Sequence, residues 1–347
     1  MKLLIVTQTV DTEDPVLGFF TQWIEEFSKH EEYIEVICLK EGKYSFPSNV
    51  SVHSLGKEHN LPTSRFTYTL RFLRLAWRLH NEYDTVFVHM NQEYVLIAGW
   101  LWKLLGKRVY MWRNHYAGSW LTDTAAGFCV KVFCTSKHSY TAKYKKTVLM
   151  PVGVSIERFS PDSRVVRRPH SILYLGRISP SKRPEVLINA LAKSAKKGTI
   201  FNASFYGSPL PQDAVYYEGL KTKLRSLGLG ASVSFHPGVP NVQTPDIYRA
   251  YEIFVNLSPS GMLDKTIFEA IACGCLALFS SADMAEIVGS EFAYADGNAD
   301  DLARHLAKAL ALSETERTAC VKEFQAKAID AHALPVLVER LYEQMKI

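Results

Sequence analysis

The feature that most constrains the fold is an alternation of short apolar segments with longer amphipathic segments along the whole chain. The apolar segments are continuous runs rather than residues in alternation, which is typical of parallel strands covered by helices on both faces. Strands that alternate with helices favour a doubly wound parallel sheet. The sequence therefore predicts an α/β protein.

The alternation forms two series. In the first, we expect strands at 2–7, 33–39, 50–55, 85–90, 108–113, 130–135 and 147–152. We expect its helices at 18–30, 65–82, 93–105 and 137–144. In the second, we expect strands at 171–176, 201–206, 232–236, 253–258, 276–280 and 292–295. We expect its helices at 184–197, 213–227, 245–251, 265–273, 283–289 and 299–312, followed by 314–330 and 334–346.

A chain of 347 residues is long enough for two hydrophobic cores, so two domains are expected. The segment between the two series, Gly153–Pro169, reads as the link between them. We expect one domain over residues 1–155 and a second over residues 156–331. The C-terminal helix, 332–347, either follows the second domain or packs back onto the first.

Composition limits the class of protein. A hydrophobic content of 47% with 22% charged residues is typical of a soluble globular enzyme. No apolar run approaches the roughly 20 residues that span a bilayer. The six cysteines lie mostly in apolar segments, as reduced cysteines of a cytosolic protein do. We expect a cytoplasmic protein, with the inner face of the membrane as an alternative location.

One predicted helix combines cations with apolar residues. Its members are Arg65, Phe66, Leu70, Arg71, Leu73, Arg74, Trp77 and Arg78. Such a helix contacts anionic lipid headgroups or presents a solvated outer face while its other face packs on a core, and both interpretations stay open. The net charge of +5 includes no basic run and no binding module, so nucleic acid is not an expected partner.

Two segments carry candidate chemistry. Gly176 ends a strand, and Arg177 and Lys182 follow in a loop that either holds both cations over a diphosphate or forms a solvated turn. Farther along, Asp264 starts a short helix that carries Glu269 among apolar residues. A buried carboxylate needs a partner, and a helix that starts on a small-residue loop is a natural anion site. Together they predict a pocket for phosphates and hydroxyls.

The order and spacing of these segments resemble the retaining glycosyltransferases of family 4. The resemblance includes Tyr206-Gly207 and the segments 233–239, 250–258 and 268–274. It implies the GT-B fold, in which two Rossmann-like domains face each other across a cleft. It assigns 1–155 to the acceptor side and 156–331 to the nucleotide-sugar donor.

The resemblance also implies residue roles. Arg177 and Lys182 would bind the donor diphosphate and stabilise the charge that develops on it, and Glu269 would bind the ribose. The remaining donor-binding positions are Gly18, Gly207, Ser208, Val239, Gly261, Met262, Leu263, Asp264, Lys265 and Thr266. His115 would face the donor sugar or be a packed histidine.

His89 and Asn91 are weaker candidates, for the acceptor side, and for His89 a structural role stays open. One position departs from the family pattern. The family often carries two glutamates separated by seven residues, but Gly261 stands where the first would be. The nearest acid is Asp264, and the backbone amides of 261–264 would instead hold sugar hydroxyls.

The predicted function is a retaining, metal-independent glycosyltransferase that moves a sugar from a nucleoside diphosphate sugar to a hydroxyl of a glycan, a lipid-linked acceptor or a small molecule. A nucleotide-sugar epimerase or hydrolase of the same fold, and an inactive nucleotide-sugar binding protein, are the alternatives. No Asp-x-Asp motif or His/Cys cluster has metal-ligand spacing, and no glycine-rich dinucleotide fingerprint follows the first strand. We therefore expect neither a metal nor another cofactor.

Overall fold

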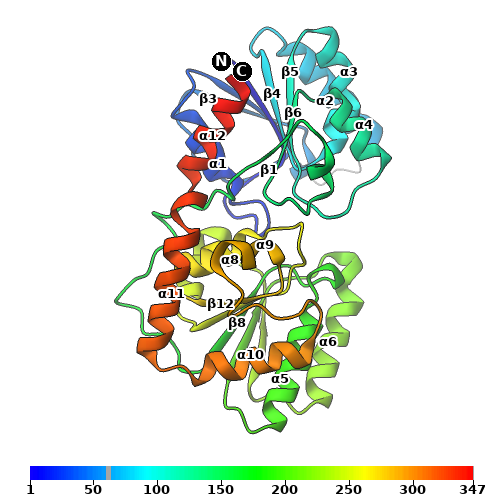
Figure 1. Ribbon diagram of the computed structural model, residues 1–347. Coiled ribbons are helices and arrows are strands. Elements are labelled where there is room, and N and C mark those ends of the chain that lie inside the picture. Colours follow the sequence, from blue (N-terminus) through cyan, green and yellow to red (C-terminus); the bar gives the residue numbers. More distant parts are fainter. Residues whose placement is uncertain (60–63, 347) are drawn as a thin grey trace. The chain divides into compact units, whose positions relative to one another are not determined.

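The computed structural model describes residues 1–59 and 64–346, and the chain forms two compact units. Unit 1 comprises Met1–Gly153 with the C-terminal helix from Leu334 onward, and unit 2 comprises Val154–Ala333. The first part of unit 1 ends at Gly153, two residues before the expected boundary at 155. Unit 2 ends at Ala333, two residues after the expected boundary at 331. Each unit is a parallel sheet flanked by helices (Figure 1).

The sheet of unit 1 has the strand order β3-β2-β1-β4-β5-β6-β7, and its strands pair in parallel. Strand β1, an inner strand of this sheet, has Leu3 opposite Ile34 on one side and Thr85 on the other. The strands are β1 (Leu3–Val10), β2 (Ile34–Glu41), β3 (Val50–Ser54), β4 (Thr85–His89), β5 (Arg108–Trp112), β6 (Lys131–Cys134) and β7 (Thr147–Leu149).

Helices cover both faces of this sheet because its strands are apolar on both sides. The helices are α1 (Phe20–Ser28), α2 (Arg65–Arg78), α3 (Gln92–Leu104), α4 (Trp120–Phe128) and α12 (Leu334–Lys346). One core contains side chains of α1 and α12, and the other contains side chains of α2, α3 and α4. Helix α12 lies beside α1, where the rings of Phe27 and Tyr342 are 5.6 Å apart (Figure 1).

The sheet of unit 2 has the order β10-β9-β8-β11-β12, again with parallel pairing. Its strands are β8 (Ser171–Leu175), β9 (Asn202–Tyr206), β10 (Val233–His236), β11 (Ile253–Asn256) and β12 (Leu276–Phe279). Its helices are α5 (Pro184–Lys196), α6 (Ala214–Ser226), α7 (Thr244–Arg249), α8 (Lys265–Ala272), α9 (Ala282–Val288), α10 (Ala299–Ala311) and α11 (Glu314–Ala328).

Three segments differ from the expectation. Helix α4 was not expected, although Ser119 and Thr122 form a capping box at its start. The expected helix 137–144 is a short 3-10 helix at Tyr140–Lys143, because the Tyr140 N–H bonds to the carbonyl of His115 and holds the segment against that loop. The expected strand 292–295 forms only an isolated bridge to Phe279.

Within residues 1–59 and 64–346, no helix is both long and apolar enough to cross a membrane. The same residues contain no group of three or more His, Cys, Asp or Glu side chains that could hold a metal ion. Independence from metal stays a prediction.

Candidate functional site

The two sequence segments with candidate chemistry meet at one place in unit 2. Strand β8 has β9 on one side and β11 on the other, so the strand order reverses between β8 and β11. Parallel sheets bind ligands beyond the carboxyl ends of their strands at such a switch point. Arg177 follows β8 and Ser258 follows β11, so both lie at this edge.

A polar cluster joins the two loops. The Lys182 ammonium lies 3.1 Å from the Ser258 hydroxyl and forms an ion pair with Asp264. The Ser258 hydroxyl donates at 2.9 Å to Oδ2 of Asp264, the same oxygen that pairs with Lys182. The Lys182 and Asp264 side chains are only 20% and 17% exposed, so the pair is poorly screened by water. We call Lys182, Ser258 and Asp264 the lysine cluster.

The lysine cluster keeps Asp264 ionised. Burial alone would raise the pKa of the Asp264 carboxyl, but the positive charge of Lys182 and hydrogen bonds from Lys182, Ser258 and the Thr266 N–H lower it below its ordinary value. Asp264 also caps α8, because Oδ1 accepts from the Thr266 N–H at 3.4 Å. The N–H of Thr266, a donor-binding position by the resemblance, is therefore bonded to Asp264 in this structure.

Glu269 is the buried carboxylate that the sequence predicts. It is 2% exposed, and it accepts from the Tyr248 hydroxyl at 3.2 Å and from the Asn241 amide at 3.4 Å. Burial raises the pKa of Glu269, and the positive charge of Lys265 with these two hydrogen bonds opposes that rise. Sequence reasoning missed Tyr248, because a single tyrosine in the short helix α7 carries no signal of its role.

Lys265 lies one turn before Glu269 at the start of α8. Burial lowers the pKa of its ammonium to about 8, while the negative charge of Glu269 raises it and the positive charge of Arg158 lowers it. The charge of Lys265 therefore changes near neutral pH.

Arg177 presents a donor that the protein does not use. Its backbone carbonyl accepts from the Tyr174 hydroxyl at 3.0 Å, which fixes the loop. Its side-chain Nε is buried, yet it has no hydrogen-bond partner among the residues that the structure describes. Buried polar groups in proteins are normally bonded, and a guanidinium can only donate, so this position calls for an acceptor such as an anion.

Gly207 is required by a close backbone contact. A Cβ atom there would lie 1.9 Å from the carbonyl oxygen of Gly176, so only glycine fits this approach of the loops after β8 and β9. Ser208 joins the neighbouring loops, since its carbonyl accepts from the Ile178 N–H at 3.3 Å and its hydroxyl accepts from the Gly238 N–H at 2.9 Å. The next residue, Val239, is half-buried. These contacts hold the loops that carry Gly207, Ser208 and Val239 next to Arg177, and we call these three residues the braced rim.

The loop before α8 shows how the chain accommodates Gly261. Gly261 has a φ of +87°, a conformation that favours glycine, and its N–H donates to Asp283 at 3.0 Å. Leu263 is buried and Met262 is half-buried. The carboxylate near Lys182 is thus supplied by Asp264, three residues after Gly261.

The remaining candidates lie in unit 1. A Cβ at Gly18 would lie 2.5 Å from the carbonyl of Asp14, so the turn before α1 needs glycine. His115 is half-buried, and its Nδ1 accepts from the Ala117 N–H at 2.9 Å. His89 is 1% exposed and stacks on Phe20 at 3.7 Å, which places it within an aromatic core.

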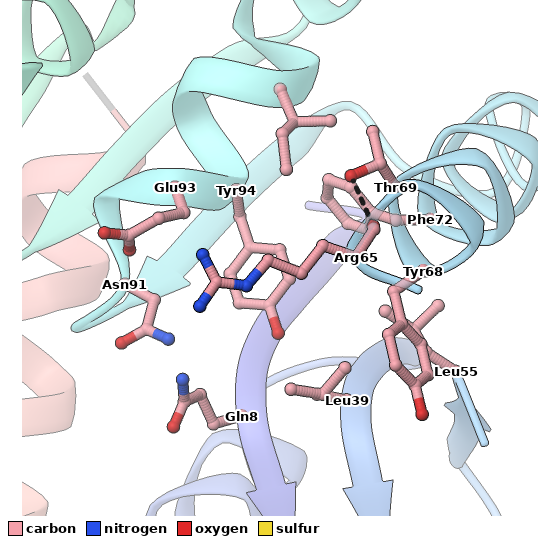
Figure 2. Close-up of a pocket in the computed structure, with 11 residues that line it drawn as sticks. Gln8, Leu39, Leu55, Arg65, Tyr68, Thr69, Phe72, Asn91, Glu93 and Tyr94 are labelled. Atoms are coloured by element: carbon pink, nitrogen blue, oxygen red, sulfur yellow. Dashed lines mark hydrogen bonds between the residues drawn. The ribbon is translucent and has the colours of Figure 1, made fainter. Parts of the chain in front are cut away.

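A pocket of about 440 Å³ opens at the switch point of unit 1, between the ends of β1 and β4. Figure 2 shows the Arg65 side chain extending into it toward the side that holds Asn91 and Glu93. The pocket is lined by Gln8, Leu39, Leu55, Arg65, Tyr68, Thr69, Phe72, Asn91, Glu93, Tyr94 and Ile97. Only Asn91 among these was predicted as an acceptor-side residue. The others come from separated segments, and only the fold brings them together.

Comparison with known proteins agrees with this geometry. Residues 155–325 match the family model described as glycosyl transferases group 1. A D-inositol 3-phosphate glycosyltransferase of Streptomyces avermitilis is 30% identical over 171 residues, which cover 46% of this chain and 36% of that protein. A mannosylfructose-phosphate synthase of Agrobacterium fabrum is 30% identical over 147 residues, 39% of this chain and 32% of that protein. The chain thus matches about a third of the length of these relatives.

Solved structures match the whole chain. The Anabaena protein HepE, solved in complex with UDP and glucose, has a TM-score of 0.81 at 18% identity, with 100% of this chain and 99% of that chain covered. HepE was also solved with UDP-glucose. Sucrose-phosphate synthase from Thermosynechococcus elongatus has a TM-score of 0.78 at 16% identity, with 100% and 99% covered. These likenesses confirm the predicted GT-B fold class.

Proposed function

We propose that the protein transfers a sugar from a nucleoside diphosphate sugar to an acceptor hydroxyl, and the match of residues 155–325 to the glycosyl transferases group 1 model supports this proposal. The observation that carries the proposal is the edge of unit 2 where the lysine cluster and Arg177 meet at the switch point. A nucleoside diphosphate supplies the anionic acceptor that the buried Arg177 Nε lacks. UDP-glucose is the first donor to test, because HepE was solved with it.

In this proposal the donor's diphosphate lies against Arg177 and Lys182. Both cations neutralise the negative charge that grows on the leaving nucleoside diphosphate as its bond to the sugar breaks, and fixed charges of this kind are usually the largest contribution to catalysis. Arg177 offers a planar fork of N–H donors, and Lys182 a compact charge. Asp264 and Ser258 hold the Lys182 ammonium in place.

Glu269 is the proposed ribose ligand. The hydrogen bond from the Tyr248 hydroxyl fixes the orientation of the Glu269 carboxylate on α8. The carboxylate oxygens would accept hydrogen bonds from the ribose hydroxyls. The braced rim of Gly207, Ser208 and Val239 receives the base. The retaining course also belongs to the proposal: the acceptor attacks from the face that the diphosphate leaves, and the leaving phosphate takes the acceptor's proton, so that no protein base or metal ion is needed.

For the acceptor we propose the pocket of unit 1. One side carries the polar ends of Gln8, Asn91 and Glu93, and the other is formed by apolar side chains such as Leu39 and Phe72 (Figure 2). Its volume is in the range of small-molecule sites. An acceptor with hydroxyls at one end and an apolar body at the other fits this division.

The test is release of nucleoside diphosphate from UDP-, GDP-, ADP- and dTDP-sugars, measured with and without a panel of hydroxyl acceptors. We expect release that depends on acceptor, with nuclear magnetic resonance showing retained anomeric configuration. Arg177→Gln and Lys182→Met should each lower turnover by about 100-fold, since each removes a charge-assisted contact. The exposed Arg225→Gln on α6 is the matched control. Equal release without acceptor would indicate a hydrolase and contradict transfer.

A further inference from the structure

Helix α2 carries large apolar side chains on its solvent-facing side. Phe66, Leu70 and Trp77 are 70%, 51% and 55% exposed. The core-facing side of the same helix is formed by Phe72 and Ala76, which are buried. The helix therefore has two apolar sides, one in the core of unit 1 and one in solvent. We call Phe66, Leu70 and Trp77 the α2 stripe.

The spacing of the α2 stripe places its members on one line. At 3.6 residues per turn, positions four and eleven residues after Phe66 are rotated by only about 40° and 20° from it. Arg74 and Arg78, both exposed, follow at about 80° and 120° on the same rotation. The stripe is thus flanked along one side by two arginines.

The charge of α2 is wholly positive. Its sequence, RFTYTLRFLRLAWR, contains four arginines and no acidic residue. Two of the arginines have other contacts: Arg65 extends into the unit 1 pocket (Figure 2) and Arg71 donates to the Leu55 carbonyl at 2.8 Å. Arg74 and Arg78 are left to define the charge beside the stripe.

The other two helices on this side of the sheet continue the pattern. Helices α3 and α4 share the core of α2, and their exposed residues include Trp100 at 50%, Leu104 at 78% and Trp120 at 71%. Tryptophan next to cations is typical of side chains that sit at the boundary between lipid headgroups and acyl chains. Large apolar side chains that are exposed on each of three neighbouring helices indicate an interaction surface.

We propose that unit 1 docks on an anionic lipid surface through the α2 stripe, with Arg74 and Arg78 on the headgroups. The apolar side chains of the α2 stripe insert into the lipid layer. The arginines of α2, which has no acidic residue, complement the negative charge of the lipid headgroups. Docking of this surface goes beyond sugar transfer and does not depend on it. Because α2 also forms a wall of the unit 1 pocket, docking brings that pocket to the lipid surface.

Co-sedimentation of the full chain with vesicles tests the proposal. We expect binding to phosphatidylcholine vesicles containing about one third phosphatidylglycerol, and little binding to pure phosphatidylcholine. Arg74→Gln with Arg78→Gln should weaken binding to the mixed vesicles about 25-fold, since each cation near an anionic surface contributes a factor of about five. Phe66→Ser with Trp77→Ser should also weaken binding to the mixed vesicles, because it removes the apolar side chains that insert.

Matched controls come from exposed residues of unit 2. Ile200→Ser with Val215→Ser removes apolar side chains that are 76% and 86% exposed, and Lys196→Gln with Arg225→Gln removes two exposed cations, one on α5 and one on α6. Both double variants should bind like the wild type. Equal weakening by controls and test variants would overturn the proposal. A dimer without vesicles, lost in Phe66→Ser with Trp77→Ser, would also overturn it by assigning the stripe to a second copy of the chain.

Discussion

Replacing Asp264 by asparagine is the most informative single change in unit 2. The substitution keeps the side-chain volume but removes the charge that pairs with Lys182, whose side chain is 20% exposed. Removing one partner of a fully buried pair costs about 3–5 kcal/mol, and an exposed pair contributes about 0–1 kcal/mol. The pair is mostly but not fully buried, so we expect unit 2 to lose about 2 kcal/mol of unfolding free energy.

Differential scanning calorimetry converts this figure into a temperature. For a unit of this size a loss of 1 kcal/mol lowers the unfolding temperature by about 2–4 °C, so Asp264→Asn should lower the unit 2 transition by about 4–8 °C. The control is Asp300→Asn, which breaks a pair with Lys193 whose side chains are 42% and 79% exposed. That variant should shift the transition by less than about 4 °C. Equal shifts in the two variants would refute the structural role of the Asp264 ion pair.

Three further changes test other parts of the account. Gly207→Ala should lower the urea midpoint by an amount worth about 1–3 kcal/mol because its Cβ meets a backbone oxygen, whereas Gly219→Ala, in an open position of α6, should raise it; similar effects would contradict the close contact. Tyr248→Phe should cost about 1–3 kcal/mol in the same assay by leaving buried Glu269 short of a donor, and an unchanged midpoint would contradict that bond. Lys265 has a pKa of about 8 and is charged below it, so the affinity for UDP should fall about fivefold from pH 7 to pH 9; the fall should vanish in Lys265→Met, and a fall of equal size there would assign it to another group.

The sequence predicted the architecture well because hydrophobic patterning is a local signal. The continuous apolar runs marked the strands of both sheets, and the helix bounds were met to within a few residues at α5 and α12. Helix α4 was missed because its signal is a single capping box at Ser119, without strong amphipathic periodicity. The segment 292–295 is apolar enough for a strand, but within the described residues it forms only one β-bridge, between Ala293 and Phe279.

The sequence predicted several residues of the candidate site, but it did not predict which of them contact one another. Arg177, Lys182 and Glu269 were named from motifs, but the ion pair of Lys182 with Asp264 joins residues 82 positions apart and is set by the strand order. The same holds for Tyr248 and Glu269, which meet because α7 packs on α8. The unit 1 pocket combines Gln8 with Leu39, Arg65 and Asn91, and no local pattern connects these positions.

Titration calorimetry with UDP tests the central claim most directly, because it measures binding at the edge of unit 2 without requiring the acceptor. The account predicts saturable binding to the wild type and to Arg225→Gln, and a dissociation constant about 10- to 100-fold higher for both Arg177→Gln and Lys182→Met, as expected when a charge-assisted hydrogen bond is lost. Binding of UDP that is unchanged in both variants would contradict it.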